Sequence, residues 1–360
     1  MKNICLVIPT LQPGGMERVM SELAGHFCQK SNLEVHLILY DSNPIIFYSI
    51  PENLVIHKPK SRFKNRLRFI YSLGRLYFLR QVVLRIEPDA ILSFGEYWNS
   101  FVLLALLGLK YPVFVSDRCR PDKHLGFYHQ SLRRILYRRA AGIIFQTSKA
   151  REFFKNLEKR VPNKVIGNPI REISTNQELI KENIVLTVGR LIPSKNHDKL
   201  IKSFVKLNKS GWKLIIIGGD AFKMTMMNDL KNMVRELEAE DKVILTGNIS
   251  DVDKFYLMSR IFVTASESEG FPNVIGEAMS AGLPVVAFDC TAGPSELITD
   301  GEDGFLIPLY NYTLLEQKLM LLMNDPDLRD RIGFKAMKRI KKFSVEEIGE
   351  KYYSFIMSDK

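Results

Sequence analysis

Cysteine pairs and long apolar runs are both missing from this chain of 360 residues. The four cysteines are scattered and form no Cys-x-x-Cys pair, which argues against a structural zinc site or a redox dithiol and favours reduced thiols. No uninterrupted apolar run approaches about 20 residues, so we expect no membrane-spanning helix. The first residues lack the cleavage site of a signal peptide, and we therefore expect a soluble, cytoplasmic protein.

Acidic residues are scarce in the first half of the chain. Residues 1–170 contain 26 Lys and Arg against 12 Asp and Glu, whereas the rest contains 25 against 28. The two parts thus carry net charges of +14 and −3. An excess confined to one half implies an anionic partner for that half, and nucleic acid, a membrane surface and a phosphorylated substrate all qualify.

Repeats and Pro/Gly/Ser-rich tracts are also absent, which together with a hydrophobic content of 46% indicates a folded globular protein. Short apolar runs alternate with helical segments, a pattern typical of parallel strands covered on both faces. We expect strands at residues 3–9, 35–40, 90–93, 113–116, 142–146, 184–188, 214–218, 243–246, 261–264 and 284–287. Helices are expected at residues 16–28, 312–323 and 344–357. The sequence therefore predicts an α/β protein with two Rossmann-like, doubly wound parallel sheets.

The alternation breaks at Gly167, Asn168 and Pro169, where a polar stretch follows. We predict a first domain over residues 1–168, a second over residues 169–340, and a C-terminal helix within residues 341–360 that packs back on the first domain. Two such sheets facing each other across a cleft would place the carboxyl ends of their strands around one ligand site.

Two loops that follow predicted strands carry groups suited to an anion. Gly14 and Gly15 come after the opening strand, where bare backbone amides and a helix N-terminus can approach an anion closely, although a tight turn explains them equally well. Arg190 and Lys195 follow the first strand of the second domain. Fixed cations at this position can neutralise a leaving diphosphate in place of a divalent metal.

The segment from Glu269 to Glu277 places one carboxylate in a loop and a second inside the next helix. Asn273 is the expected N-cap of that helix. A carboxylate about one turn into the helix can accept two hydrogen bonds from a ribose diol, while the free amides at the helix start face phosphate or sugar oxygens.

In their order along the chain these motifs resemble those of family 4 retaining glycosyltransferases of the GT-B fold, and Gly282-Leu-Pro-Val and Gly293-Pro-Ser-Glu are similar too. The resemblance implies a nucleotide-sugar donor, a UDP-sugar in our interpretation, with no cofactor. It implies that the second domain binds the donor and the first the acceptor. The implied donor contacts are Arg190 and Lys195 to the diphosphate, Glu277 to the ribose, Glu269 to the transferred sugar, Gly14 and Gly15 to sugar or phosphate, the amides of Phe271, Asn273 and Val274, and Asn248 and Ile249 beside the base.

One position departs from the pattern of that family. Many relatives carry a histidine shortly after the strand at residues 113–116, whereas this chain has Asp117 and Arg118 there. We expect one of these two residues to take the place of the histidine and to help the leaving group depart or orient the acceptor.

Asp251 and Asp253 match the Asp-x-Asp metal motif of the other large glycosyltransferase fold. They follow Ser250 at a predicted helix start, where acidic side chains favour the helix dipole, so we predict no metal.

Residues 58–85 contain nine Lys and Arg and no acidic residue, interleaved with apolar side chains. On a helical wheel Lys64, Arg68 and Arg75 share one face, which is either a solvated face or a surface for an anionic partner. Arg133, Arg134, Arg138 and Arg139 add to the same half. We expect peripheral contact with the cytoplasmic face of an anionic inner membrane, and a lipid-linked or polysaccharide acceptor of surface glycan synthesis.

Three other interpretations were weighed. A sugar-nucleotide epimerase or hydrolase on the same scaffold would need catalytic acids and bases in the cleft. A basic nucleic-acid-binding protein fits the charge but leaves Glu269, Glu277, Arg190 and Lys195 without a role, and no nucleic-acid-binding motif occurs. An inactive sugar-nucleotide-binding module is at odds with the full set of motifs. Retaining, metal-independent transfer of an N-acetylhexosamine or hexose is the preferred hypothesis, with the five catalytic candidates Glu269, Arg190, Lys195, Arg118 and Asp117.

Overall fold

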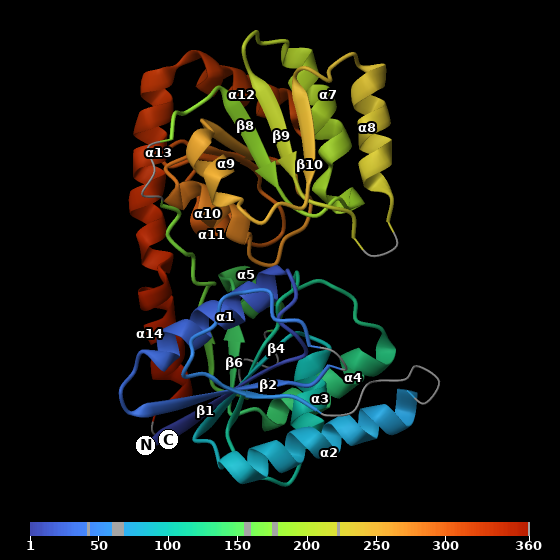
Figure 1. Cartoon of the computed structure of the whole chain (residues 1–360), viewed down its shortest axis with the longest axis vertical. Helices are drawn as coiled ribbons and strands as arrows, with labels where there is room; N and C mark the ends of the chain where they lie inside the picture. Colours follow the sequence, from blue (N-terminus) through green and yellow to red (C-terminus); the bar gives the residue numbers. More distant parts are fainter. Residues whose placement is uncertain (42–43, 60–67, 155–159, 175–178, 222–223, 359–360) are drawn as a thin grey trace. The chain divides into compact units, whose positions relative to one another are not determined.

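The computed structural model describes the chain except residues 42–43, 60–67, 155–159, 175–178, 222–223 and 359–360. The chain forms two compact units (Figure 1). Unit 1 comprises Met1–Pro169 together with Val345–Lys360, and unit 2 comprises Ile170–Ser344. The chain therefore passes between the units at 169/170 and again at 344/345, where the sequence put the boundaries at 168/169 and 340/341.

Unit 1 is built on a seven-stranded sheet in the order β3-β2-β1-β4-β5-β6-β7, and every neighbouring pair is parallel. The strands are β1 (Lys2–Ile8), β2 (Leu33–Leu39), β3 (Val55–His57), β4 (Ala90–Phe94), β5 (Val113–Ser116), β6 (Gly142–Phe145) and β7 (Asn163–Val165). The helices are α1 (Gly15–Cys28), α2 (Arg68–Ile86), α3 (Trp98–Ala105), α4 (Phe127–Leu136), α5 (Ser148–Phe153) and α14 (Val345–Ile356), with a 3₁₀ turn at Tyr137–Arg139. The strand order reverses between β1 and β4, which makes the loops after these strands the expected ligand edge.

The last helix of the chain, α14, completes the core of unit 1. Its Tyr352 is fully buried, and Phe355 lies edge-on to Phe114 of β5 at a centroid distance of 5.5 Å. Gly349 lies so close to α1 that a Cβ atom there would sit 2.4 Å from the ring of His26. The helix therefore fits against α1 because residue 349 has no side chain.

Unit 2 is built on a six-stranded parallel sheet in the order β10-β9-β8-β11-β12-β13. Its strands are β8 (Ile184–Val188), β9 (Lys213–Ile217), β10 (Val243–Gly247), β11 (Ile261–Thr264), β12 (Val285–Phe288) and β13 (Phe305–Ile307). Its helices are α7 (His197–Leu207), α8 (Met226–Glu236), α9 (Asp253–Met258), α10 (Asn273–Ser280), α11 (Pro294–Leu297), α12 (Tyr312–Asn324) and α13 (Pro326–Ile340), with 3₁₀ turns at Pro193–Lys195 and Lys341–Phe343. Here the strand order reverses between β8 and β11.

Both faces of the unit 2 sheet are covered, which explains why its strands are apolar throughout. Val185 and Val263 belong to the core on one face, and Leu186 and Phe262 to the core on the other. Successive side chains of a strand point to opposite faces, so a strand buried on both faces needs a continuous apolar run. The predicted doubly wound parallel sheets are confirmed.

The sequence patterns assigned no position to the short strands β3, β7 and β13, or to the helices α3, α4, α5, α7, α8, α11 and α13. The three strands are three residues long, too short to produce a readable periodicity. Among the described residues, no helix has the length and apolar character needed to cross a membrane.

Candidate functional site

Lys195 and Glu269 meet at the point where the strand order of unit 2 reverses. Lys195 ends the 3₁₀ turn after β8, Glu269 lies in the loop after β11, and Nζ of the lysine is 2.5 Å from Oε1 of the glutamate. Both side chains are largely buried. Buried Asn196 donates from Nδ2 to the carbonyl of Ala265 at 2.9 Å and so ties the two loops together. The carboxylate and the cation predicted to hold sugar and diphosphate are thus neighbours.

Glycines let the neighbouring strands β8 and β9 of unit 2 end close together. A Cβ atom on Gly218, which follows β9 with φ of 149°, would lie 1.9 Å from the carbonyl oxygen of Gly189, which follows β8. The stem of Lys195 passes over Gly189. Arg190 comes next in this loop, and its side chain is exposed. The predicted diphosphate loop is therefore shaped by backbone contacts that only glycine permits.

Helix α10 carries Glu277, but it begins differently from the prediction. Pro272, not Asn273, is the N-cap residue, and the amide of Asn273 donates to the carbonyl of Phe271 at 3.0 Å. The predicted N-cap was wrong because proline, which has no N–H to satisfy, holds the position before the helix. Gly293 fixes it there, since a Cβ atom at residue 293 would lie 2.3 Å from Cδ of Pro272. The Gly293-Pro-Ser-Glu motif thus supports the start of α10.

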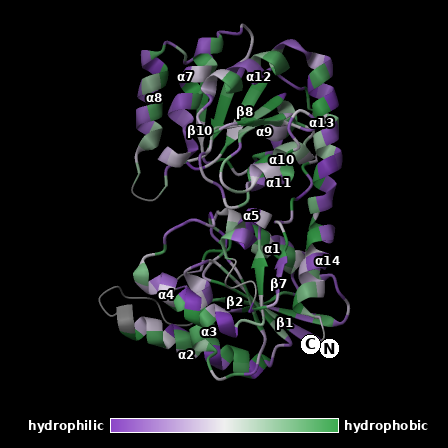
Figure 2. Ribbon diagram, turned by 180° about the vertical axis from the view of Figure 1, so that it is seen from behind, coloured by the Kyte–Doolittle hydropathy of each residue, from purple (hydrophilic) through white to green (hydrophobic). Residues whose placement is uncertain are grey.

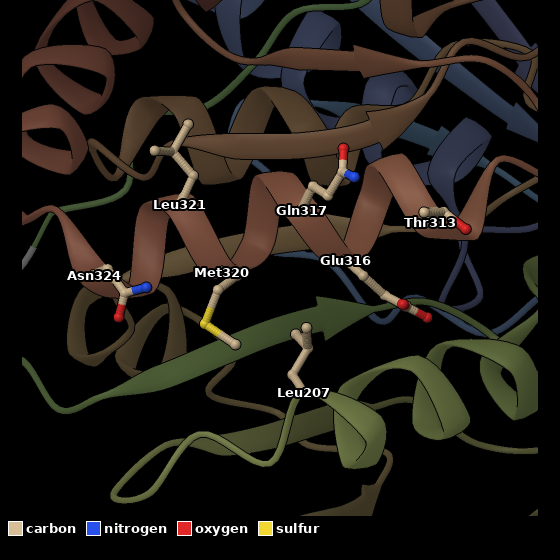
Figure 3. Close-up of a pocket in the computed structure, with 7 residues that line it drawn as sticks. All are labelled: Leu207, Thr313, Glu316, Gln317, Met320, Leu321 and Asn324. Carbon is tan, nitrogen blue, oxygen red and sulfur yellow. The ribbon is translucent and has the colours of Figure 1, made fainter.

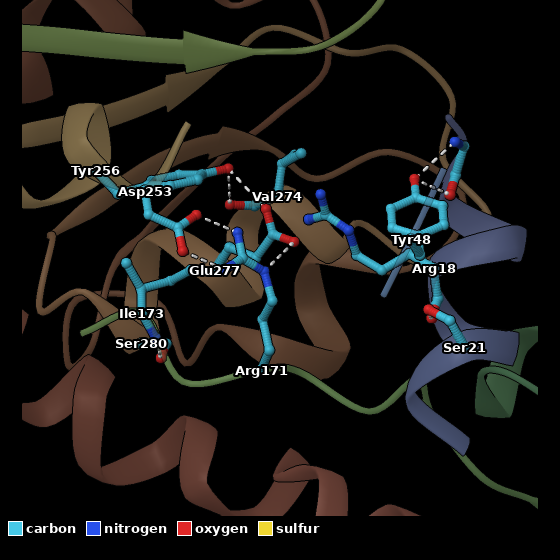
Figure 4. Close-up of polar contacts among 11 residues, drawn as sticks. Arg18, Ser21, Tyr48, Arg171, Ile173, Asp253, Tyr256, Val274, Glu277 and Ser280 are labelled. Atoms are coloured by element: carbon cyan, nitrogen blue, oxygen red, sulfur yellow. Dashed lines mark hydrogen bonds and ion pairs between the residues drawn. The ribbon is translucent and has the colours of Figure 1, made fainter. Parts of the chain in front are cut away.

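Glu277 lies buried one turn into α10, held by two side chains that the sequence did not single out (Figure 4). Tyr256 of α9 donates from its hydroxyl to Oε2 at 3.0 Å, and Nε of Arg171 is 3.7 Å from Oε1. Both Nη atoms of Arg171 donate to the carboxylate of Asp253. Burial acts to lower the pKa of Arg171, but the hydrogen bonds to Asp253 and the charge of Glu277 outweigh it, so the pKa lies above its ordinary value.

The second aspartate of the Asp-x-Asp sequence is therefore engaged in an ion pair. Asp253 is the first residue of α9, as the helix-dipole interpretation requires, and its two oxygens face the Arg171 guanidinium. Within the described residues no three His, Cys, Asp or Glu side chains come together in a cluster that could hold a metal ion.

The loop after β10 carries the two residues predicted beside the base. Asn248 lies against the backbone of Gly219, where a Cβ atom would sit 2.7 Å from its Nδ2. Ile249 is partly buried on the core that also contains Ile275. Asn248 is exposed. Both residues thus extend the edge formed by the loops after β8 and β9.

In unit 1 the Gly14-Gly15 loop follows β1 and opens α1. The amide of Gly14 donates to the hydroxyl of Tyr48 at 2.8 Å, and this hydroxyl donates to the Gly14 carbonyl at 2.9 Å (Figure 4). Arg18 of α1 lies over the ring of Tyr48, 5.5 Å from its centroid. Tyr48 was missed because nothing in its sequence surroundings marks it as a partner of this loop.

Asp117 and Arg118 follow β5, and each is bound by side chains of unit 1. The carboxylate of Asp117 accepts from Arg133 at 3.1 Å and from Tyr137 at 2.5 Å. Arg118 donates to Asn168 at 2.7 Å and to Tyr352 of α14 at 2.9 Å. Its guanidinium also lies over the ring of Phe94 at 3.3 Å. These contacts hold α14 and Asn168, which lies just before the boundary at 169/170, against the sheet of unit 1.

Glu96, beside the reversal point of the unit 1 sheet, was also missed. It follows β4, and Lys123 donates to its Oε1 at 2.8 Å. Although burial raises the pKa of Glu96, the hydrogen bond from Lys123 outweighs this effect and lowers it. A lone glutamate after an apolar run gives no sequence signal, so only the fold reveals the pair.

The predicted basic face of the helix after residue 58 is wrong at Arg75. Lys64 lies outside the described residues, and Arg68 begins α2 with its side chain outside the description. Arg75 is only 6% exposed, because it lies one turn before the buried Leu79 on the inward stripe of α2. Burial lowers its pKa, and the nearby Asp41 acts in the opposite direction. Exposed residues of α2 include apolar ones, with Ile70 61% and Tyr77 66% exposed, together with the exposed Arg85.

Arg133, one of the four arginines that follow, is also buried, through its pairing with Asp117. Arg134, Arg138 and Arg139 are exposed. On the same helix, α4, Phe127 and Tyr128 are 78% and 81% exposed. Figure 2 shows that α2 and α4 mix hydrophilic and hydrophobic residues along their length.

An open groove of about 430 Å³ lies elsewhere on unit 2, between α12 and the end of α7 (Figure 3). Leu207, Met320 and Leu321 line it together with Glu316, which forms an ion pair with Lys206. None of its lining residues belongs to the candidate site.

Comparison with solved structures identifies the fold. The chain superimposes on the sucrose-phosphate synthase of Thermosynechococcus elongatus with a TM-score of 0.82 at 15% identity, over 98% of this chain and 97% of that one. It superimposes on Anabaena HepE in complex with UDP with a TM-score of 0.80 at 19% identity, over 100% of both chains. Two Rossmann-like units of this topology are typical of the GT-B class, and the predicted fold class is confirmed.

Family models cover most of the sequence. The model described as "Glycosyltransferase Family 4" matches residues 13–172, and the one described as "Glycosyl transferases group 1" matches residues 170–339. The chain belongs to the family 4 glycosyltransferases of the GT-B fold and is a hexosyltransferase, as the motifs predicted.

Two curated relatives match along their whole length. One, from Campylobacter jejuni, is named "GalNAc-alpha-(1->4)-GalNAc-alpha-(1->3)-diNAcBac-PP-undecaprenol alpha-1,4-N-acetyl-D-galactosaminyltransferase"; it is 27% identical over 100% of this chain and 99% of its own. The other is "Amylovoran biosynthesis glycosyltransferase AmsD" of Erwinia amylovora, 26% identical over 98% of each chain.

Proposed function

We propose that this enzyme transfers an N-acetylhexosamine or hexose from a UDP-sugar to a lipid-linked or polysaccharide acceptor of surface glycan synthesis, with retention and without a metal. The observation that carries the proposal is the contact between Lys195 and Glu269. Glu277, which follows in the sequence, is buried on α10. The Campylobacter relative is named for an undecaprenol-linked acceptor, which supports an acceptor of that kind here.

The roles follow from the chemistry of the groups. When the sugar bond breaks, negative charge grows on the leaving diphosphate, and the fixed charges of Arg190 and Lys195 stabilise it. Glu269 accepts hydrogen bonds from hydroxyls of the transferred sugar. Glu277 accepts from the ribose diol, because a carboxylate offers several lone pairs at once. Backbone amides near Phe271 and Val274, at the start of α10, favour the negatively charged donor.

The decisive assay measures transfer from a panel of UDP- and GDP-sugars to short polyprenyl-diphosphate glycans with EDTA present. We expect product with a UDP-sugar, and a loss of roughly 10²-fold or more in turnover for Glu269→Gln and for Arg190→Ala, since each removes a group that meets developing charge. Glu236→Gln on α8 and Lys202→Ala on α7, both exposed, are the matched controls.

Other outcomes of that assay contradict the proposal in distinct ways. Donor that is hydrolysed or epimerised without acceptor points to the rival enzyme class. Product that vanishes in EDTA and returns with a divalent ion overturns metal independence. Absence of turnover, combined with strong, salt-dependent binding to nucleic acid, revives the nucleic-acid interpretation.

We also propose that unit 1 contacts the cytoplasmic face of the inner membrane through α2 and α4. Exposed Phe127, Tyr128 and Ile135 lie on α4 with exposed Arg134, and Arg138 and Arg139 follow directly. Aromatic side chains that enter a lipid surface gain about 1.5–3 kcal/mol each, and each arginine near anionic lipid adds about 1 kcal/mol. This combination suits an acceptor held in the bilayer.

Vesicle sedimentation tests the membrane surface. Full-length protein is expected to bind vesicles containing phosphatidylglycerol and to bind much less to pure phosphatidylcholine. Replacing both Phe127 and Tyr128 by Ser should weaken binding at least tenfold, whereas Phe334→Ser, which removes a ring that is 53% exposed from α13 of unit 2, should not. Equal binding to both lipids, or equal effects of the two variants, would refute this surface.

A further inference from the structure

The segment that enters unit 2 runs along helix α10. Ile170 lies against Gly276, where a Cβ atom would sit 2.7 Å from its Cδ1. The amide of Ile173 donates to Oγ of Ser280 at 3.0 Å (Figure 4). Gly276 immediately precedes Glu277, so the residues around 171 are packed on the part of the helix that carries the buried carboxylate.

Arg171 faces two carboxylates from this segment. Its two Nη atoms form a fork on Asp253, while Nε points to Oε1 of Glu277 at 3.7 Å (Figure 4). The fork fixes the plane of the guanidinium, because two parallel hydrogen bonds leave it no freedom to rotate. Asp253 thus orients Arg171, and Arg171 places a positive charge beside Glu277.

The contacts of Glu277 differ between its two oxygens. Oε2 accepts a hydrogen bond from Tyr256 at 3.0 Å, whereas the 3.7 Å separation to Arg171 is an ion pair without hydrogen-bond geometry. Each carboxylate oxygen can accept more than one hydrogen bond. The charge of Arg171 therefore compensates for the burial of the Glu277 carboxylate.

We propose that Arg171 is a positioning residue, which with Asp253 and Tyr256 holds the Glu277 carboxylate in the orientation that binds the ribose diol of the nucleotide. The inference rests on the proposed function, in which Glu277 binds the ribose. In this role Arg171 needs no contact of its own with the donor. It acts through Glu277, and its effect depends on the hydroxyls of the ribose.

The test compares two nucleotides on the full-length protein by calorimetry: UDP, and 2′,3′-dideoxy-UDP, which lacks both hydroxyls. Wild-type protein should bind UDP at least tenfold more tightly. Arg171→Met should weaken UDP binding at least tenfold, which corresponds to about 1.4 kcal/mol of binding free energy. It should leave the affinity for 2′,3′-dideoxy-UDP within about twofold of the wild-type value, because that nucleotide has no hydroxyls for Glu277 to bind. Arg331→Met, an exposed arginine on α13, is the matched control.

Two further variants keep the inference testable if Arg171→Met does not fold. Tyr256→Phe removes only the hydroxyl that meets Oε2, and Asp253→Asn removes one charge of the fork. Each should reduce the preference for UDP over 2′,3′-dideoxy-UDP, as Arg171→Met does. Arg171→Lys should keep more of this preference than Arg171→Met.

The outcomes separate the inference from the proposed function. Equal weakening of both nucleotides by Arg171→Met would reduce Arg171 to a structural role and overturn the inference, while the wild-type preference for UDP still upheld the role of Glu277. Unchanged binding of UDP in Arg171→Met would overturn it as well. A wild-type protein that binds both nucleotides equally would refute the ribose contact itself, and the inference with it.

Discussion

At the scale of the residue, a buried histidine supports the loop that carries Arg190. His197, the first residue of α7, is 2% exposed, and its Nε2 lies 3.3 Å from the carbonyl oxygen of Arg190. Burial lowers its pKa from 6.5 to about 4, against the effect of that carbonyl. The diphosphate loop is thus braced by a neutral imidazole.

The first prediction concerns the acid stability of unit 2. Because the folded-state pKa is lowered, the unfolded chain binds the extra proton between pH 6.5 and 4, so stability is complete above pH 6.5 and falls as the pH approaches 4. Between pH 7 and pH 4, the free energy of unfolding of the His197→Gln variant should fall by roughly 3 kcal/mol less than that of the wild type, because each unit of pKa difference corresponds to about 1.36 kcal/mol. His197 is the only histidine between residues 170 and 344.

Urea unfolding measures this effect. Trp212, buried in unit 2, is the reporter in a Trp98→Phe background, since the chain has two tryptophans and the other lies in unit 1. If the free energy of unfolding changed with pH in the same way for wild type and His197→Gln, the lowered pKa of His197 would be contradicted.

The second prediction concerns Gly218. Alanine there would place Cβ 1.9 Å from the Gly189 carbonyl oxygen, so the loops after β8 and β9 must separate. We expect Gly218→Ala to destabilise unit 2 by more than 3 kcal/mol, beyond the roughly 1–3 kcal/mol of backbone strain alone, and to abolish UDP binding. Gly211→Ala is the control, because residue 211 also has positive φ but nothing within 4 Å of a Cβ atom. Similar losses in both variants would show that strain, not the close approach, dominates.

At the scale of the element, sequence patterns predicted the buried strands but not which face of a helix points inward. Strands β8 and β11 were predicted with their observed bounds, since a strand buried on both faces reads as an apolar run. The order of Gly189, Lys195, Glu269 and Glu277 predicts a donor site in unit 2. Helix α2 was predicted with the wrong face inward, because an arginine on the buried stripe is indistinguishable from a surface arginine without its tertiary neighbours.

The third prediction tests the phase of α2. Arg75→Ala should lower the free energy of unfolding of unit 1 by about 1–3 kcal/mol, because it removes a buried cation and its packing. Arg85→Ala on the same helix, where the side chain is exposed, should change it by less than about 0.5 kcal/mol. Unfolding followed by Trp98 fluorescence in a Trp212→Phe background reports on unit 1. Equal effects would place Arg75 on the outer face after all.

The partners of Glu277 were beyond the reach of sequence analysis for a related reason. Arg171, Asp253 and Tyr256 come from three separate segments, and only the packing of residues 170–173 on α10 brings them to one carboxylate. Sequence order identifies Glu277 as a candidate, but it contains no information on which charges face it.

At the scale of the whole molecule, the two units differ in how they are encoded. Unit 2 is one continuous segment, Ile170–Ser344, whereas unit 1 needs α14 from beyond it. The fourth prediction is that residues 170–344 expressed alone fold and bind UDP, while residues 1–169 alone expose the surface that α1 presents to α14 and aggregate. Adding a peptide of residues 345–360 should restore solubility to the latter. Cooperative unfolding of residues 1–169 without that peptide would contradict it.

The placement of α14 also determines the order in which the units can mature on the ribosome. Unit 2 can complete its core as soon as its own sequence has emerged, whereas the first 169 residues must wait, with Tyr352 and Phe355 still unsynthesised, until unit 2 has been translated. The basic, apolar half of the enzyme is therefore the last to become native. During this interval nascent chains leave the surface of α1 that packs against α14 uncovered, and translation that stops short of α14 yields a folded unit 2 tethered to an unfinished unit 1.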